Sequence, residues 1–83
     1  DQTENKAENN LIIYPNPIKS NDFLYIESED KIEEIVILNT NGHLCYSQIG
    51  NNKQIYLNLK PDIYILGARR SNGSLIYRKL VVQ

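Results

Sequence analysis

The sequence has very little of the chemistry that disulfides and metal sites require. Its 83 residues contain one cysteine, Cys45, and one histidine, His43, and neither tryptophan nor methionine. A single cysteine excludes an intramolecular disulfide. A zinc site needs three or four protein ligands at definite spacing, and no second cysteine or histidine exists to supply them. We therefore expect no metal and no cofactor.

The chain also lacks a charge excess and a long apolar run. Nine basic and ten acidic side chains give a formal net charge of -1, which leaves no positive field to attract a polyanion. No apolar run approaches the roughly 18 residues that a membrane-spanning helix needs. We therefore expect neither nucleic-acid binding nor membrane insertion.

No set of residues suggests catalysis. Cys45 and His43 lie two apart on a predicted strand, but a cysteine nucleophile would also need an orienting group and an oxyanion hole. Arg69 and Arg70 could grip an anion, yet their place beside Asn72-Gly73 favours a hairpin tip. Five acidic residues lie close together in the sequence but lack the regular spacing of a calcium-binding loop, so we interpret them as a solvated loop. They are Glu27, Glu29, Asp30, Glu33 and Glu34. We expect no enzyme.

The first ten residues have almost no apolar content. Ala7 is the only hydrophobic side chain among them, so they cannot bury enough surface to offset the entropy of ordering. We interpret residues 1–10 as a flexible linker from an upstream region, and residues 11–83 as one folded domain.

From Leu11 onward, short apolar runs alternate with turn residues at intervals of about ten residues, which is typical of a sandwich or barrel. We predict seven strands, at residues 11–14, 23–28, 34–39, 44–49, 54–59, 63–69 and 74–82. Asn41-Gly42 and Asn72-Gly73 predict hairpins because both residues of such a pair accept positive φ. The apolar block at residues 35–38 predicts a central strand buried on both faces.

Four segments resemble one family, in order, over residues 11–83. Residues 14–17 read Tyr-Pro-Asn-Pro and are similar to the "YPNP" opening of type IX secretion system (Por secretion system) C-terminal sorting domains, type A. Residues 35–44 resemble the family's strand, Asn and Gly pattern. Residues 57–66 resemble its "DLSDLPAGIYLVKV" segment, and residues 79–83 resemble its terminal "KKIVVK". The residues that carry family motifs are Tyr14, Pro15, Asn16, Pro17, Asn39, Gly42, Asp62 and Tyr64.

Two positions depart from the family pattern. Asp62 stands where the family normally has Gly, which predicts a turn built with a residue that adopts the left-handed conformation less readily. Cys45 stands where an aliphatic residue is more usual.

The resemblance implies a seven-stranded immunoglobulin-like antiparallel β-sandwich that acts as a non-catalytic secretion signal. It implies an upstream cargo domain in the same chain, and the type IX translocon and a sortase-like peptidase as partners. The chain would pass through the periplasm and end at the cell surface or outside, after cleavage within residues 1–10. Recognition would involve the final strand, at Lys79, Leu80, Val81, Val82 and Gln83.

The residues themselves leave alternatives open. A terminal edge strand offers unpaired backbone groups for strand addition, but Leu80 and Val82 also fit an ordinary core strand. The prolines and Asn16 fit a structural turn. The six tyrosines favour core and inter-sheet packing. An exposed tyrosine surface would instead indicate a stand-alone immunoglobulin-like adhesion module that binds carbohydrate or protein.

Overall fold

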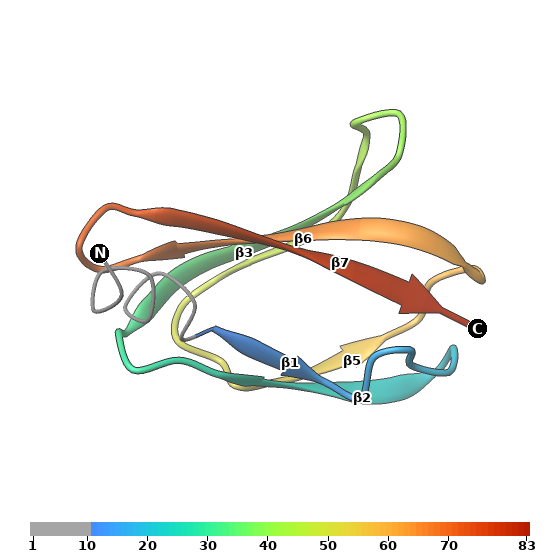
Figure 1. The fold of residues 1–83 in the computed structure, drawn as a ribbon, viewed down its shortest axis with the longest axis horizontal. Helices are drawn as coiled ribbons and strands as arrows, with labels where there is room; N and C mark the ends of the chain where they lie inside the picture. Colours follow the sequence, from blue (N-terminus) through green and yellow to red (C-terminus); the bar gives the residue numbers. More distant parts are fainter. Residues whose placement is uncertain (1–10) are drawn as a thin grey trace, which may run out of the picture.

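The computed structural model describes residues 11–83 and contains seven strands packed in two layers (Figure 1). They are β1 (Ile12–Tyr14), β2 (Asp22–Glu27), β3 (Ile32–Asn39), β4 (Leu44–Ile49), β5 (Gln54–Leu57), β6 (Asp62–Arg70) and β7 (Leu75–Val82). Within this part of the chain no helix is long and apolar enough to cross a bilayer. The segment interpreted as a linker lies outside the described residues.

One sheet has the strand order β1-β2-β5 and the other has the order β4-β3-β6-β7, with antiparallel pairing throughout. This arrangement confirms the predicted seven-stranded antiparallel sandwich. The fifth strand ends two residues earlier than predicted, at Leu57, and the third begins two residues earlier, at Ile32. The sheets are further connected by an isolated parallel bridge between Ile18 and Val82.

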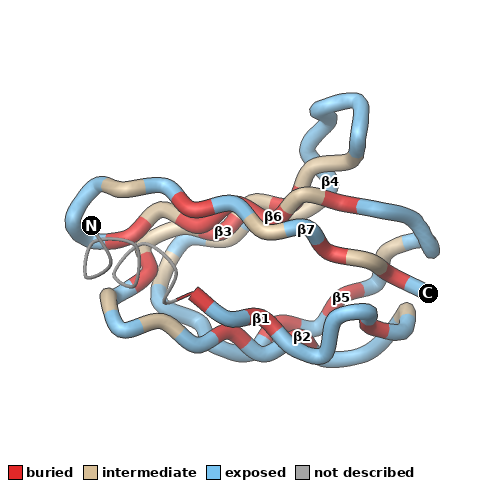
Figure 2. Tube along the Cα trace, in the orientation of Figure 1, coloured by how far each residue is buried: buried red, intermediate tan, exposed pale blue. Residues whose placement is uncertain are grey.

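The core lies between the two sheets and consists of aliphatic side chains from every strand except β4. Figure 2 shows buried positions alternating with exposed ones along the strands. In β2, for example, Leu24 and Ile26 are buried whereas Phe23 and Tyr25 are exposed. Each fully buried Leu or Ile stabilises the fold by about 1.5–3 kcal/mol relative to an exposed one. Because every second side chain of a strand faces the core, this burial supplies most of the stabilisation of the two layers.

The central strand β3 is buried on one face only, which corrects the prediction of two buried faces. Ile35 and Ile37 are completely buried in the core. Val36 and Leu38 are only partly buried because no further layer covers the outer face of the sheet among the described residues. An unbroken apolar run therefore does not by itself indicate a second covering layer.

Both predicted hairpins form, with a turn geometry different from that expected. Gly42 and Gly73 have φ values of 84° and 89°, whereas Asn41 and Asn72 do not have positive φ. In the first turn the side-chain Oδ1 of Asn39 accepts hydrogen bonds from the backbone N–H groups of Asn41 and His43, each at 2.9 Å. The Asn39 side chain therefore stabilises the turn, which was expected to depend on positive φ at both Asn41 and Gly42.

Most tyrosines lie on the outer faces, which corrects the prediction that they pack in the core. Tyr64 is buried and Tyr46 partly buried, but four others remain 38–55% exposed: Tyr14, Tyr25, Tyr56 and Tyr77. Two cross-strand aromatic pairs form on the three-stranded sheet. The Tyr14 and Tyr25 rings stack with centroids 5.6 Å apart, and Phe23 meets Tyr56 edge-on at 5.2 Å. Such pairs stabilise a sheet from its solvent side.

Candidate recognition surface at the last strand

The last strand, β7, lies at an edge of the four-stranded sheet and pairs with β6 on one side. Leu80 and Val82 point inward and are 0% and 3% exposed. Lys79 and Gln83 are exposed, and Val81 is partly buried. Of the five residues predicted for recognition, two are therefore core residues, and the other three present side chains that a partner can reach.

Asn16 fastens this strand from the opposite end of the sequence. Its Nδ2 donates to the carbonyl oxygen of Lys79 at 2.7 Å, and its Oδ1 accepts from the N–H of Val81 at 3.0 Å. A primary amide has the same donor and acceptor as a peptide group, so Asn16 pairs with β7 as a strand residue would. The sequence suggested a local turn role for this residue, whereas its side chain acts on residues 63 and 65 positions away.

The chain continues along the same edge after Pro17. The N–H of Ile18 donates to the oxygen of Val81 at 2.9 Å, and the N–H of Gln83 donates to the oxygen of Ile18 at 2.7 Å. Ser20 then donates its N–H to the oxygen of Gln83 at 3.0 Å. The Ile18 side chain is only 1% exposed, so it is buried in the core and anchors this segment there.

These contacts overturn the expectation that the final strand offers free backbone groups. The outward-facing carbonyl oxygen of Lys79 and both backbone groups of Val81 and Gln83 are already paired with Asn16, Ile18 and Ser20. Strand addition at that position would have to displace these hydrogen bonds. A partner that reads this region without disrupting it must contact side chains.

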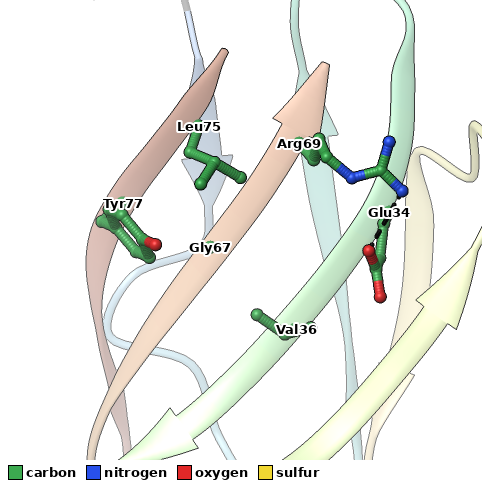
Figure 3. Close-up of a pocket in the computed structure, with 6 residues that line it drawn as sticks. All are labelled: Glu34, Val36, Gly67, Arg69, Leu75 and Tyr77. Carbon is green, nitrogen blue, oxygen red and sulfur yellow. Dashed lines mark hydrogen bonds and ion pairs between the residues drawn. The ribbon is translucent and has the colours of Figure 1, made fainter. Parts of the chain in front are cut away.

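The outer face beside β7 contains a shallow pocket formed around Gly67 (Figure 3). The Tyr77 ring lies over this glycine, and a Cβ added to Gly67 would fall 2.9 Å from Tyr77 Cε1. Val36 and Leu75 complete the apolar part of the lining. The glycine therefore creates the space that the tyrosine ring occupies on the sheet surface.

Charged residues close one end of that pocket. Arg69 Nη1 lies 2.7 Å from Glu33 Oε1, and Arg69 Nη2 lies 3.1 Å from Glu34 Oε1. Both carboxylates and the guanidinium are partly exposed, so the pairs contribute at most about 1 kcal/mol. Two residues of the predicted acidic group are thus partners of an arginine across the β3–β6 pair.

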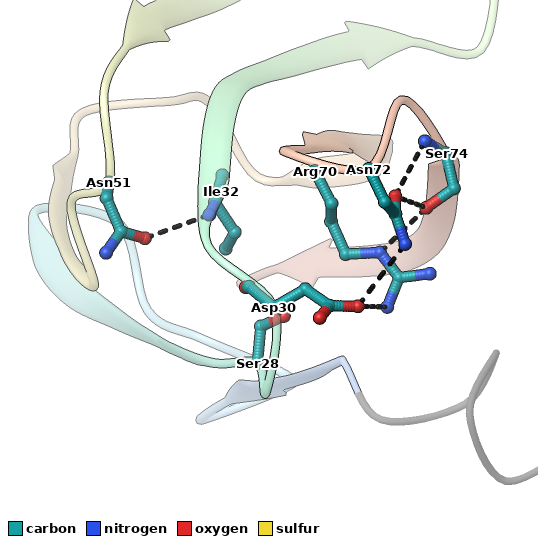
Figure 4. A network of polar contacts seen from close by, with 7 residues as sticks. All are labelled: Ser28, Asp30, Ile32, Asn51, Arg70, Asn72 and Ser74. Carbon is teal, nitrogen blue, oxygen red and sulfur yellow. Dashed lines mark hydrogen bonds and ion pairs between the residues drawn. The ribbon is translucent and has the colours of Figure 1, made fainter.

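Arg70 is held on the opposite, inner face of the sheet and is 4% exposed (Figure 4). Its Nε donates to Ser74 Oγ at 3.0 Å, and its Nη1 lies 3.6 Å from Asp30 Oδ2. Asn72 Oδ1 also accepts a hydrogen bond from the backbone N–H of Ser74, with 2.9 Å between the nitrogen and the oxygen. This network connects the β6–β7 turn to the segment before β3, so a structural role accounts for Arg70 and Asp30.

The remaining family-motif residues have structural roles of several kinds. Tyr14 donates its hydroxyl to Glu27 Oε2 at 2.9 Å, and this hydrogen bond is the main cause of the raised pKa of Tyr14. Pro15 and Pro17 are exposed in the loop that carries Asn16, and each follows a cis peptide bond. Asn39 and Gly42 form the hairpin turn.

Tyr64 is a buried residue whose hydroxyl donates to the carbonyl oxygen of Lys60 at 2.7 Å. A tyrosine near the start of a strand, bonded to backbone a few residues upstream, is the tyrosine corner of immunoglobulin-like sandwiches. Burial is the first cause of its raised pKa. Asp62 begins β6 and does not have positive φ, so the predicted left-handed turn at Asp62 was wrong and the missing glycine causes no strain there.

The thiol and the imidazole do not form a reactive pair. Cys45 is exposed, and its Sγ donates to the backbone oxygen of His43 at 3.6 Å. Among residues 11–83, no group of three or more His, Cys, Asp or Glu residues is arranged to hold a metal ion.

The sequence was also compared with known proteins. The family model described as secretion system C-terminal sorting domain matches residues 12–83. Among curated proteins, no significant relative is found. Members of this family are non-catalytic signals for secretion across the outer membrane, to the surface or outside, and they interact with secretion machinery. Because this family model covers nearly all of the sequence, the chain belongs to the Por secretion system C-terminal sorting domain family.

Proposed function

We propose that the secretion machinery reads the folded domain through the outward side chains of its last strand. The observation that supports this proposal is the fastening of β7 by Asn16 and Ile18. Because the backbone edge is already paired, the side chains of Lys79, Val81 and Gln83 are held at fixed positions on the surface. A signal recognised in a folded state needs this kind of preorganised surface, since a rigid surface loses little entropy on binding.

We further propose the finer features of the pathway. The domain is of type A, and its partners are the type IX translocon and a sortase-like peptidase. An upstream cargo domain passes through the periplasm and reaches the cell surface or the exterior, and cleavage within residues 1–10 then separates it from residues 11–83. The support for cleavage there is compositional, since polar chain of this kind is a preferred site of proteolysis.

The experiment uses a periplasmic reporter fused upstream of residues 1–83 in a bacterium with this secretion system. Deleting residues 79–83 would remove Leu80 and Val82 from the core, and loss of export could then reflect unfolding. Substitution of the outward side chains separates recognition from folding. We expect Lys79→Glu combined with Val81→Thr to leave most of the reporter in the periplasm.

Lys53→Glu is the matched control because Lys53 is an exposed lysine on the segment before β5. It should be exported as the unchanged fusion is, and both variants should retain the thermal midpoint of the unchanged domain. Normal export of the folded Lys79→Glu, Val81→Thr fusion would contradict recognition at this strand. The length of the released cargo, measured by mass spectrometry, tests cleavage within residues 1–10.

A second candidate function rests on the aromatic face of the three-stranded sheet. Ile12, Phe23 and Tyr56 are 53%, 41% and 51% exposed, although the outer face of an antiparallel sheet is normally polar. Exposed apolar groups of this extent indicate binding surfaces, and we propose carbohydrate as the ligand class. Glycan-array binding by the purified chain that disappears in Tyr56→Ala would support this function, and the absence of any binding would exclude it.

A further inference from the structure

Strand β4 is the second edge of the four-stranded sheet, on the side opposite β7. Within residues 11–83 the order is β4-β3-β6-β7, so no described strand pairs with the far side of β4. An edge of this kind presents a row of backbone donors and acceptors to any extended chain that approaches. Natural sheets usually protect such edges with charge, proline, short length or a covering segment.

The other three edges of the sandwich have such protection. The end of β7 is covered by Asn16 and Ile18, and Lys79 adds charge there. On the other sheet, β1 has three residues and β5 has four, and very short edge strands offer little backbone for another strand to pair with. Short length therefore limits strand addition at β1 and β5, and direct contacts with charge beside them limit it at residues 79–83 of β7.

β4 has none of these protections. Its six residues, Leu-Cys-Tyr-Ser-Gln-Ile, include no charged residue and no proline. Ile49 and Leu44 are 75% and 60% exposed, which makes them the most exposed large hydrophobic side chains of the described chain. Figure 1 shows that the loop between β3 and β4 projects away from the two layers, so this region is accessible from outside.

An unpaired polar atom on the same strand also points to a missing partner. Tyr46 donates its hydroxyl to Gln48 Oε1, but Gln48 Nε2 is buried and has no hydrogen-bond partner within residues 11–83. Exchanging the oxygen and nitrogen of this amide would only move the deficit to the other atom. A buried unpaired group of this kind costs about 1–3 kcal/mol, and a partner strand beside β4 gives the amide a hydrogen-bond partner once its side chain turns toward the edge.

We propose that β4 pairs antiparallel with β4 of a second copy of this chain, with the two-fold axis at Ser47. In this register Ser47 faces its own equivalent, and Gln48 faces Tyr46 of the other copy. A two-fold interface places the same surface of each copy against the other. Because β4 carries no charged residue, pairing it with its own equivalent brings no like charges together. The result is one continuous sheet of eight strands, four from each copy. This inference is independent of the sorting role.

The paired area is small, so the association is weak and depends on concentration. Edge pairing along six residues buries less than the roughly 1,000 Å² expected of a stable interface. Sedimentation equilibrium of the 83-residue chain should show the average mass rising from that of the monomer toward twice that value as concentration increases. A chain that remains monomeric at millimolar concentration would overturn the proposal.

The first variant places charge at the two-fold axis. Ser47→Lys sets two ammonium groups opposite each other and should weaken association at least tenfold, whereas Ser71→Lys makes the same change at an exposed turn and should leave it unaltered. Tyr56→Lys tests the aromatic face. If association persists in Ser47→Lys, or is lost in Tyr56→Lys alone, the interface lies elsewhere and the proposal fails.

The second variant reads the register directly and does not depend on destabilising anything. Residues directly opposite in an antiparallel pair have Cα atoms about 4.5–5.5 Å apart, within the range of a disulfide. Ser47→Cys in a Cys45→Ser background should therefore form a disulfide-linked dimer under mild oxidation. Cys45→Ser alone should not, and failure of the Ser47→Cys chain to cross-link would contradict pairing centred at Ser47.

Discussion

At the scale of single residues, the side chain of Asn16 matters most because it forms hydrogen bonds across nearly the whole sequence. The two groups it serves, the Lys79 oxygen and the Val81 N–H, belong to the edge of β7. Removing the amide leaves both groups to water or without a partner. These two hydrogen bonds, here called the Asn16 tether, also hold in place the surface that the sorting role is proposed to use. Their loss should therefore affect both stability and export.

Asn16→Leu, which keeps a similar volume, should lower the free energy of unfolding by about 1–3 kcal/mol. Asn16→Asp keeps the acceptor for Val81 but sets a carboxylate oxygen against the carbonyl oxygen of Lys79, and because two acceptors repel each other it should destabilise the chain by a comparable amount. Denaturant titration measures both effects, and hydrogen exchange of the Val81 amide locates them. Asn52→Leu, at an exposed loop asparagine, should change little; an equal loss there would contradict a specific tether.

A second prediction at this scale concerns Tyr64 and alkaline pH. Burial raises the pKa of its hydroxyl above the ordinary value of 10.0. A group with a raised folded-state pKa contributes stability that is fully present below the unfolded-state pKa and is lost as pH rises through the folded-state pKa. The unchanged chain should therefore lose stability above about pH 10.

Tyr64→Phe should be about 1 kcal/mol less stable at neutral pH because it loses the hydrogen bond to Lys60. It should also lose less stability than the unchanged chain as the pH is raised into the alkaline range. Chemical denaturation at a series of pH values compares the two curves. Parallel curves would show that Tyr64 is not responsible for the alkaline loss.

At the scale of elements, the pairing of β6 with β7 depends on how Gly67 and Tyr77 share space on the outer face. The register places them directly opposite each other. Glycine weakens a strand because it has no side chain to pack, and an aromatic ring that lies over it from the neighbouring strand compensates for this. The two residues therefore form one packing unit.

A double-mutant cycle tests this unit. Gly67→Ala should destabilise the chain by about 1–2 kcal/mol because the new Cβ meets the Tyr77 ring at 2.9 Å. In a Tyr77→Ala background the same change should cost much less, since only the contact with Val36 Cγ2 at 3.3 Å remains. Additive effects in the cycle would show that the ring and the glycine are not coupled.

At the scale of the whole molecule, the two sheets share one core, and the Asn16 loop connects them. A core of this size unfolds in one step. Leu24→Ala, at a completely buried position in the three-stranded sheet, should reduce stability by about 2–5 kcal/mol. Because of the shared core, amide protection in β6 of the other sheet should fall by a similar amount. Hydrogen exchange that changes in β1, β2 and β5 alone would indicate independent sheets.

The sequence by itself determined the number of strands, their approximate bounds, the two hairpins and the family. These features depend on patterns within a few residues, namely period-two alternation, turn glycines and short motifs, and such patterns act locally. The buried sites Ile55 and Leu57 followed from alternation in the same way, because the fifth strand has one clean apolar face.

Only the tertiary structure decided which faces are covered and which distant groups meet. Alternation shows that Phe23 and Tyr25 share a face, but both faces of β2 are apolar, so burial depended on where the second sheet lies. The Asn16 tether and the Arg69 ion pairs depend on strand register, and a slip of one residue moves every side chain to the other face. Hydrogen bonds that join residues 16 and 81 leave no local pattern to detect.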